Sequence, residues 1–146
     1  MGAGYAGLRI RSLTMSNKNI YLKYGKVLIE QGAEDDKSAY IIEDGSLSVH
    51  KDGKHICDLH KGGFVGEMSW ILGEPRSATV TSISENCQVR EITADEFSLL
   101  WETNPKALLP VLRVLTDRIA NTTRSLAETK EILGNLQKTL RNGNGG

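Results

Sequence analysis

Short runs that alternate apolar and polar residues dominate the chain from residue 18 to residue 92. Several runs are rich in β-branched and aromatic residues, a composition that suits a half-buried strand. These runs are residues 26–31, 38–43, 46–51, 54–59, 78–83 and 87–92. Turn signals separate them, and Asp52-Gly53 is the dipeptide typical of a tight hairpin. Many short strands at roughly even spacing predict a β-sandwich or a jelly roll.

After residue 92 the apolar spacing becomes helical. Thr93 followed by Glu96 is the capping-box pattern that begins a helix. Beyond Pro105 and Pro110, one stripe recurs in steps of three and four residues, at Leu112, Leu115, Ile119, Thr122, Leu126, Thr129, Leu133, Leu136 and Leu140. Such a heptad stripe predicts a coiled-coil helix about 43 Å long, which is longer than a compact jelly roll covers. We therefore expect it to pair with a second copy; packing on its own domain is the alternative.

Composition and charge narrow the function classes. Eighteen basic and eighteen acidic residues give a formal net charge of zero, so no broad basic field is available to bind nucleic acid. The apolar runs are shorter than the ~20 residues that span a bilayer, so no membrane association is expected. With no export signal, Cys57 and Cys87 are interpreted as free thiols and the chain as cytoplasmic.

The stretch GFVGEMSWILGEPRSATV, residues 63–80, places Glu67 nine residues before Arg76. EMSWIL is long enough for one or two helical turns, and Arg76 is expected to begin the next strand. Helix-start N–H groups and an Arg fork suit phosphate oxygens, while Glu67 accepts hydrogen bonds from nearby hydroxyls. An anion beside a diol is the outline of a ribose phosphate; an ion pair between Glu67 and Arg76 is the alternative. The acidic run at 34–36 is interpreted as a solvated loop without a role.

Residues 63–80 closely resemble the phosphate-binding cassette of the cyclic nucleotide-binding domain family, which includes the Crp-Fnr-like sensor domains. Gly66-Glu67 matches the Gly-Glu pair of the cassette, and Arg76-Ser77-Ala78 matches its Arg-x-Ala. The resemblance covers about residues 20–140. It implies a fold that is mainly β with α: a jelly-roll-like, eight-stranded β-roll with short helices, followed by a long C-terminal dimerisation helix.

Carried over residue by residue, the resemblance implies that Arg76 pairs with the cyclic phosphate and that Glu67 accepts the ribose 2′-hydroxyl. Gly66 would leave room for the sugar. Backbone N–H groups would also hold the phosphate, with a contribution from the Ser77 hydroxyl; they belong to Met68, Ser77 and Ala78.

The helical stretch RIANTT, residues 118–123, is similar to the part of the long helix where Crp-Fnr-like members contact adenine. The resemblance implies that Thr122 and Thr123 hydrogen-bond a purine at the dimer interface, and that ligand binding and the dimer helix are coupled by a population shift. A polar seam position that fixes helix register is the alternative. Cyclic AMP is therefore favoured over cyclic GMP as the regulatory ligand, and Ser77 is compatible with that choice.

The resemblance and the patterns together divide the chain into four segments. They are a weakly ordered N-terminal segment at 1–17, a cyclic nucleotide-binding β-roll at 18–110, the long helix at 111–141 and a flexible tail at 142–146. The winged helix-turn-helix of the transcription factors would follow that helix and is not in this sequence. We expect no direct nucleic-acid binding from these residues and an output through a downstream effector, whether the chain is a fragment or a module acting alone.

Two other functions compete with a sensor. A cupin-like metal enzyme would use the hairpin residues His50, His55, Cys57 and His60, but no set of three or four ligands converges there in the sequence. No nucleophile, base and orienting group form a set either, so neither a metal nor an enzyme is expected. A degenerate β-roll that only dimerises is the other alternative. Trp70 is expected to pack on the roll, with base stacking as its alternative.

Overall fold

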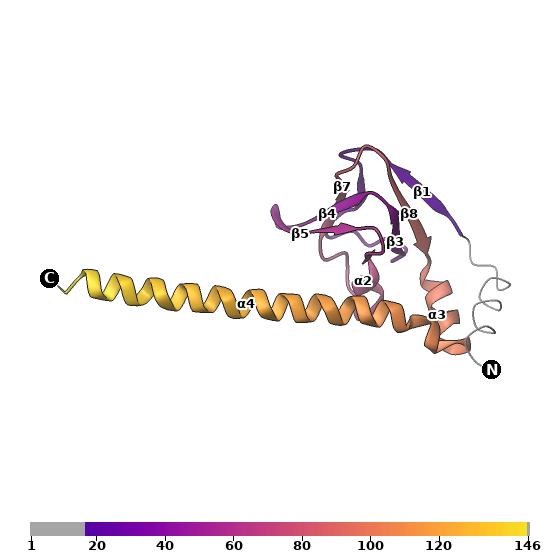
Figure 1. Cartoon of the computed structure of the whole chain (residues 1–146). Helices are drawn as coiled ribbons and strands as arrows, with labels where there is room; N and C mark the ends of the chain where they lie inside the picture. The colour runs from indigo at the N-terminus through magenta and orange to yellow at the C-terminus, as the bar shows by residue number, and fades with distance from the viewer. Residues whose placement is uncertain (1–16, 146) are drawn as a thin grey trace. The chain divides into compact units, whose positions relative to one another are not determined.

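The computed structural model describes residues 17–145 of the chain. The segment 1–17, interpreted above as weakly ordered, thus lies outside the described residues except for Asn17. Within the described part, the strands form two four-stranded sheets (Figure 1). The strands are β1 (Asn19–Leu22), β2 (Val27–Ile29), β3 (Ala39–Asp44), β4 (Ser46–Lys51), β5 (Lys54–His60), β6 (Phe64–Val65), β7 (Thr79–Ser82) and β8 (Cys87–Ile92).

Both sheets are built from antiparallel pairs. The order is β1-β8-β3-β6 in one sheet and β2-β7-β4-β5 in the other. One apolar face of each sheet turns toward the other, and the side chains between them form a single core. This core consists of Leu22, Ile29, Tyr40, Ile42, Leu47, Val65, Val80, Cys87 and Val89. The predicted jelly-roll-like β-roll is confirmed.

Each of the six predicted strand runs overlaps a strand of the structure. The hairpin predicted at Asp52-Gly53 joins β4 to β5, with Val49 opposite Cys57. Two strands were not predicted: β1, which pairs along β8 at the edge of its sheet, and β6, which has only two residues. With two residues, β6 is too short for a period of two to be recognised in the sequence.

Helix α3 (Ala94–Thr103) begins where the capping box predicts. The Thr93 hydroxyl accepts a hydrogen bond from the Glu96 backbone N–H at 3.2 Å, and the Glu96 carboxylate accepts one from the Thr93 N–H at 2.8 Å. These two bonds satisfy N–H groups at the start of α3 that no helical carbonyl can reach. A 3₁₀ turn, η1 (Pro105–Leu108), follows α3.

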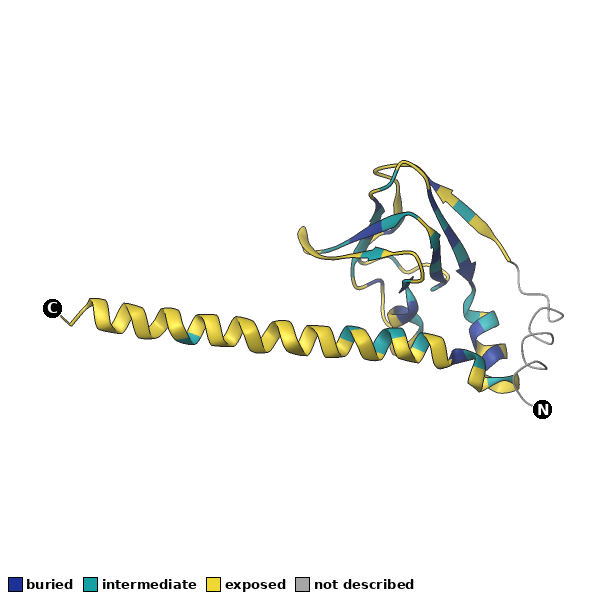
Figure 2. Cartoon of the chain, in the orientation of Figure 1, coloured by how far each residue is buried: buried dark blue, intermediate teal, exposed yellow. Residues whose placement is uncertain are grey.

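Helix α4 (Leu109–Gly143) is a unit of its own, continuous through Gly134. Its 35 residues correspond to a length of about 52 Å. No residue of α4 is buried within the single chain, and most of its surface is exposed (Figure 2). The exposed apolar side chains include most of the predicted stripe: Leu112, Ile119, Leu126, Leu133, Leu136 and Leu140. Among the described residues, no helix combines the length and hydropathy needed to cross a membrane.

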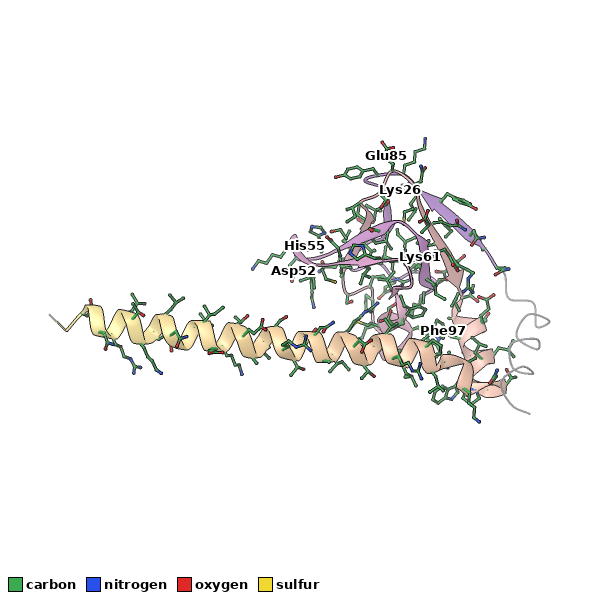
Figure 3. All side chains as sticks on the ribbon, in the orientation of Figure 1. Lys26, Asp52, His55, Lys61, Glu85 and Phe97 are labelled. Carbon is green, nitrogen blue, oxygen red and sulfur yellow. The ribbon has the colours of Figure 1, made fainter. Side chains whose placement is uncertain are left out.

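An aromatic cluster joins the helix of the 63–80 stretch to α3. Trp70 stacks on Phe97 with ring centroids 5.0 Å apart and an interplanar angle of 23°. Phe97, which Figure 3 labels on α3, also meets Phe64 edge to face at 5.7 Å. Trp70 therefore packs within the protein, as expected, and its ring face on Phe97 is not available to a base.

Phe97→Ala should destabilise the protein by about 3–5 kcal/mol, because a ring only 3 % exposed leaves a cavity between two aromatic partners. Trp101→Ala on the same helix is the matched control. Its ring is 63 % exposed, and it should change the free energy of unfolding by less than about 0.5 kcal/mol. Urea unfolding of both variants measures the difference; equal losses would show that the aromatic cluster does not stabilise the fold.

Candidate functional site

The stretch 63–80 forms a strand, a short helix and a loop. After β6, helix α2 (Glu67–Leu72) runs between two glycines in the left-handed conformation, Gly66 with φ 93° and Gly73 with φ 66°. Residues with a side chain adopt these angles only with strain. The two glycines thus set where the predicted helix begins and where it ends.

Gly66 lies against the most crowded part of the site. A Cβ at this position would meet the Ser38 carbonyl oxygen at 2.7 Å, Arg76 Nη1 at 2.9 Å and Ile29 Cδ1 at 3.2 Å. The absence of a side chain therefore lets the guanidinium of Arg76 approach the backbone. The resemblance implied that the space beside Gly66 is left for a sugar. On the side where a Cβ would point, this space is filled by atoms of the protein.

Arg76 lies in a loop three residues before β7, so the prediction that it begins a strand is wrong. Its backbone pairs instead with the loop between β2 and β3. The Gly32 N–H donates to the Arg76 carbonyl at 2.8 Å, and the Arg76 N–H donates to the Ala33 carbonyl at 3.0 Å. These bonds satisfy both backbone groups outside the sheet, and they bring residues 32–38 onto the site.

The guanidinium of Arg76 is buried and hydrogen-bonded on several sides. Nη1 donates to the Gly66 carbonyl at 2.8 Å and to the Ser69 hydroxyl at 3.0 Å, and Nη2 donates to the Ser38 carbonyl at 2.7 Å. The residue is only 3 % exposed. A charge that is buried this far requires such partners, because it has lost its hydration.

Asp35 is the ion partner that the structure gives Arg76. Nε of Arg76 is 2.9 Å from both carboxylate oxygens of Asp35. Burial on its own would raise the pKa of Asp35, but hydrogen bonds from Arg76 and from the Lys37 N–H, with the charge of Arg76, outweigh it and lower that pKa. Asp35 is therefore ionised at neutral pH.

Sequence reasoning assigned Asp35 no role, and the structure corrects that interpretation. The two partners are 41 positions apart. One carboxylate in an acidic run of three gives no local signal of which side chain turns inward. Only the backbone pairing of Arg76 with residues 32–33 selects it.

Glu67 is brought to the same place as Arg76. It is 1 % exposed, in the first turn of α2, and it follows Gly66, whose carbonyl oxygen accepts from Arg76. The short apolar run between the two charges forms most of helix α2. A buried carboxylate and a buried guanidinium therefore occupy one small region, and hydroxyls and an anion are the groups that they bind best.

The other predicted site residues differ in their exposure and in the unit of the chain that carries them. Met68 is 48 % exposed, Ser77 is exposed and Ala78 is half-buried, all within the 63–80 stretch. Thr122 and Thr123 are exposed on α4, which belongs to the other unit. The predicted ligand residues therefore fall into a group around Arg76 and a pair on α4.

The hairpin histidines do not form a metal centre. His55 bonds Asp58 at 2.8 Å, His60 bonds Ser46 at 2.7 Å, and His50 meets the His55 ring edge to face. Figure 3 labels His55 and Asp52 on this hairpin. Across residues 17–145, no three His, Cys, Asp or Glu side chains are grouped to hold a metal ion.

Comparison with known proteins gives consistent results. The family model described as "Cyclic nucleotide-binding domain" matches residues 19–104. A cyclic nucleotide-gated potassium channel of Rhizobium etli is 31 % identical over 94 residues, which are 64 % of this chain and 26 % of the channel. The cAMP-activated global transcriptional regulator CRP of Pasteurella multocida is 28 % identical over 136 residues, 88 % of this chain and 65 % of the regulator. The chain thus spans less than two thirds of either relative.

Solved structures with the same fold include nucleotide complexes. One, described as "Sp-2Cl-cAMPS bound to PKAR CBD2", has a TM-score of 0.64 and 26 % identity, covering 88 % of this chain and 80 % of that one. Another, "cAMP bound PfPKA-R (141-441)", has a TM-score of 0.60 and 28 % identity, covering 77 % of this chain and 37 % of that one.

Gly66→Ala and Gly73→Ala separate backbone strain from crowding. Both place Ala in the left-handed region, which costs about 1–2 kcal/mol, but a Cβ at Gly73 meets nothing within 4 Å. Gly66→Ala should lose a further ~1–3 kcal/mol of unfolding free energy, because it pushes the Ser38 carbonyl and Arg76 apart. Chemical denaturation measures the gap; no difference between the two variants would contradict the close approach.

Proposed function

Because this chain belongs to the cyclic nucleotide-binding domain family, we propose that it is a regulatory sensor. It binds cyclic AMP in preference to cyclic GMP, and binding changes the state of its long helix. The observation that carries this proposal is the buried pair at one site: Arg76 at 3 % and Glu67 at 1 % exposure, linked through the Gly66 carbonyl. A domain without a ligand has little reason to retain both charges inside.

We assign the ends of the ligand by charge. Arg76 binds the cyclic phosphate, and Glu67 accepts the ribose 2′-hydroxyl because a carboxylate repels the anion. The exposed Ser77 hydroxyl and the backbone N–H groups of Met68, Ser77 and Ala78 add donors for the phosphate. The structures of similar fold that hold cAMP or Sp-2Cl-cAMPS and the cAMP-activated relative support this ligand class.

We assign adenine to α4 because residues 118–123 resemble the part of the long helix where Crp-Fnr-like members contact that base. Thr122 and Thr123 are exposed on α4, and their hydroxyls both donate and accept, as the Watson–Crick and Hoogsteen edges of adenine require. In this assignment the base reaches the helix of the dimer, so ligand binding and helix pairing favour one another. The output passes to an effector through α4, and the family's role is regulatory rather than catalytic.

Homodimerisation through α4 is the second part of the proposal. Leu112, Ile119, Leu126, Leu133, Leu136 and Leu140 are each at least half exposed in the single chain. Such a stripe, repeated at heptad spacing over eight turns or so, is typical of a coiled coil. Leu115 and Thr122 lie on the same stripe, and Thr122 links the seam to the base.

A degenerate β-roll that only dimerises is the second candidate, and one observation favours it. The Asp35 carboxylate already occupies Nε of Arg76, so the guanidinium does not need a ligand for its charge to be balanced. Calorimetric titration with cyclic AMP and with cyclic GMP distinguishes the two functions. A saturable heat of binding with cyclic AMP supports the sensor. No binding of either nucleotide at millimolar concentration supports a β-roll that only dimerises.

Arg76→Ala should weaken cyclic AMP binding by roughly 2–5 kcal/mol, because a buried charged contact loses one partner. It also removes a donor from the buried Ser38 carbonyl and Ser69 hydroxyl, while the Gly66 carbonyl keeps the Ser69 hydroxyl as its donor, so its unfolding is measured alongside. Arg76→Lys keeps the charge but not the fork and should show an intermediate loss. Arg90→Ala is the control. It removes an Arg of β8 whose Nε lies 2.8 Å from the Glu43 carboxylate, and it should bind cyclic AMP with unchanged affinity. Unchanged affinity in a folded Arg76→Ala would exclude the phosphate assignment.

The double variant Leu115→Asp, Leu126→Asp should convert a dimer into a monomer, since two charges on the seam must be desolvated for the helices to pair. Ala120→Asp with Ala127→Asp places the same charges off the stripe and should leave the dimer intact. Sedimentation equilibrium of the two proteins gives the mass directly. A dimer that survives in the seam variant would refute the predicted interface.

A further inference from the structure

A glutamine side chain joins the loop after β2 to the tip of the β4–β5 hairpin. Gln31 Nε2 donates to the Asp52 carboxylate at 2.8 Å, and the Asp52 N–H donates to Gln31 Oε1 at 2.9 Å. Asp52, which Figure 3 labels on the hairpin, is in the left-handed region at φ 52°. The donor and the acceptor of one amide are thus both used on a single turn residue. We call these two bonds the amide clamp.

The backbone beside the clamp holds both ends of the segment that runs from Arg76 to Thr79. The Gln31 N–H donates to the Thr79 hydroxyl at 3.0 Å. At the other end, the backbone of residues 32–33 exchanges two hydrogen bonds with that of Arg76, at 2.8 and 3.0 Å. The two residues between these ends, 77–78, carry N–H groups that are assigned above to the phosphate. Their position therefore depends on where residues 31–33 are held.

The clamp lies just beyond the ends of two strand ladders. The β4–β7 ladder ends toward the hairpin tip at the pair of His50 with Thr79, and the β2–β7 ladder ends at the pair of Ile29 with Val80. Past these pairs, the clamp and the Gln31–Thr79 bond join the loop after β2, the hairpin tip and the start of β7. Gln31 thus extends the order of the sheet to the segment that precedes β7.

Freedom in the loop after β2 would reach the phosphate donors directly. Gly32 has φ 82°, and a glycine has more backbone conformations to lose on ordering than any other residue. The clamp restricts these conformations because it fixes the preceding residue by its side chain as well as by its N–H. When only a fraction of the molecules keeps the binding-competent conformation, the apparent Kd rises by the reciprocal of that fraction.

We propose that Gln31 is a positioning residue for the cyclic nucleotide. Its amide clamp to Asp52 keeps the segment between Arg76 and Thr79 in the conformation that presents the N–H groups of residues 77–78 to the phosphate. This inference rests on the proposed function. Gln31 does not contact the ligand and acts through the backbone of residues 32–33, so it contributes to the affinity for the phosphate rather than to recognition of the base.

Calorimetry with cyclic AMP on the full chain tests the proposal. Gln31→Met keeps the length of the side chain and removes both bonds of the clamp, so it should weaken cyclic AMP binding by about three- to tenfold. Gln88→Met is the matched control, because it makes the same substitution at a half-buried Gln of β8, in the other sheet. It should change the affinity by less than about twofold. Urea unfolding shows that both variants are folded. Equal losses in the two variants, or no loss in Gln31→Met, would overturn the proposal.

An exchange of donor and acceptor checks that the clamp itself is responsible. Gln31→Glu removes the donor and sets two carboxylates against each other, so it should bind cyclic AMP at least as weakly as Gln31→Met. Asp52→Asn keeps an acceptor for Gln31 Nε2 and should bind within about twofold of the wild type. In the double variant, the new amide donates to the new carboxylate, and the affinity should return to within about twofold of the wild type.

A purely electrostatic effect of the two substitutions gives a different pattern. Asp52→Asn alone would then tighten cyclic AMP binding by as much as Gln31→Glu weakens it, and the double variant would show the sum of the two effects. That additive result would overturn the proposal. If Gln31→Met does not fold, Gln31→Glu and the double variant take its place.

Amide hydrogen exchange, followed by NMR on isotope-labelled protein, separates positioning from support of the hairpin alone. Without ligand, Gln31→Met should speed exchange at the Gly32 and Arg76 N–H groups by at least about threefold, along with exchange at Asp52. Faster exchange at Asp52 only, with unchanged affinity for cyclic AMP, would show that the clamp merely supports the turn; the positioning role then fails while the sensor proposal stands. No binding of cyclic AMP by the wild type overturns both.

Discussion

A buried guanidinium is the constraint around which the site is organised. Arg76 is bonded to the Ser38 carbonyl before β3, to the Gly66 carbonyl and the Ser69 hydroxyl at α2, and to the Asp35 carboxylate. Because an isolated charge cannot remain in the interior, these segments must meet around it. The requirement extends to residues without charge: Gly66 has no side chain where Nη1 approaches, and Ser69 supplies its hydroxyl from within a helix.

The same bonds that satisfy Arg76 limit how a ligand can use it. Backbone carbonyls and buried hydroxyls fix the guanidinium in place before any ligand arrives, which reduces the entropy lost on binding. Preorganisation of this kind leaves few donors of Arg76 free for a ligand.

The two units of the chain meet different physical requirements. In the β-roll, facing sheets and the Trp70–Phe97 stack bury the apolar surface within one chain. Helix α4 has no buried residue of its own, and its leucines remain at the surface of the monomer. In the proposed dimer, the second copy of α4 covers this apolar surface. The proposed association and ligand binding can thus be linked without any change to the core of the roll.

Local patterns were sufficient for most of the fold and for part of the site. The alternation of residues identified the longer strands, the Thr93 and Glu96 pair located the start of α3, and the heptad spacing identified α4, because each signal lies within a few residues of its structural consequence. The 63–80 stretch likewise indicated Glu67 and Arg76, whose spacing is bridged by one short helix. Strand β6 was not predicted because its two residues are too few to show a period. Asp35, Ser38 and the loop position of Arg76 were decided by tertiary structure alone: which carboxylate meets the guanidinium depends on backbone bonds between residues 32–33 and 76, and no property of the acidic run itself records that contact.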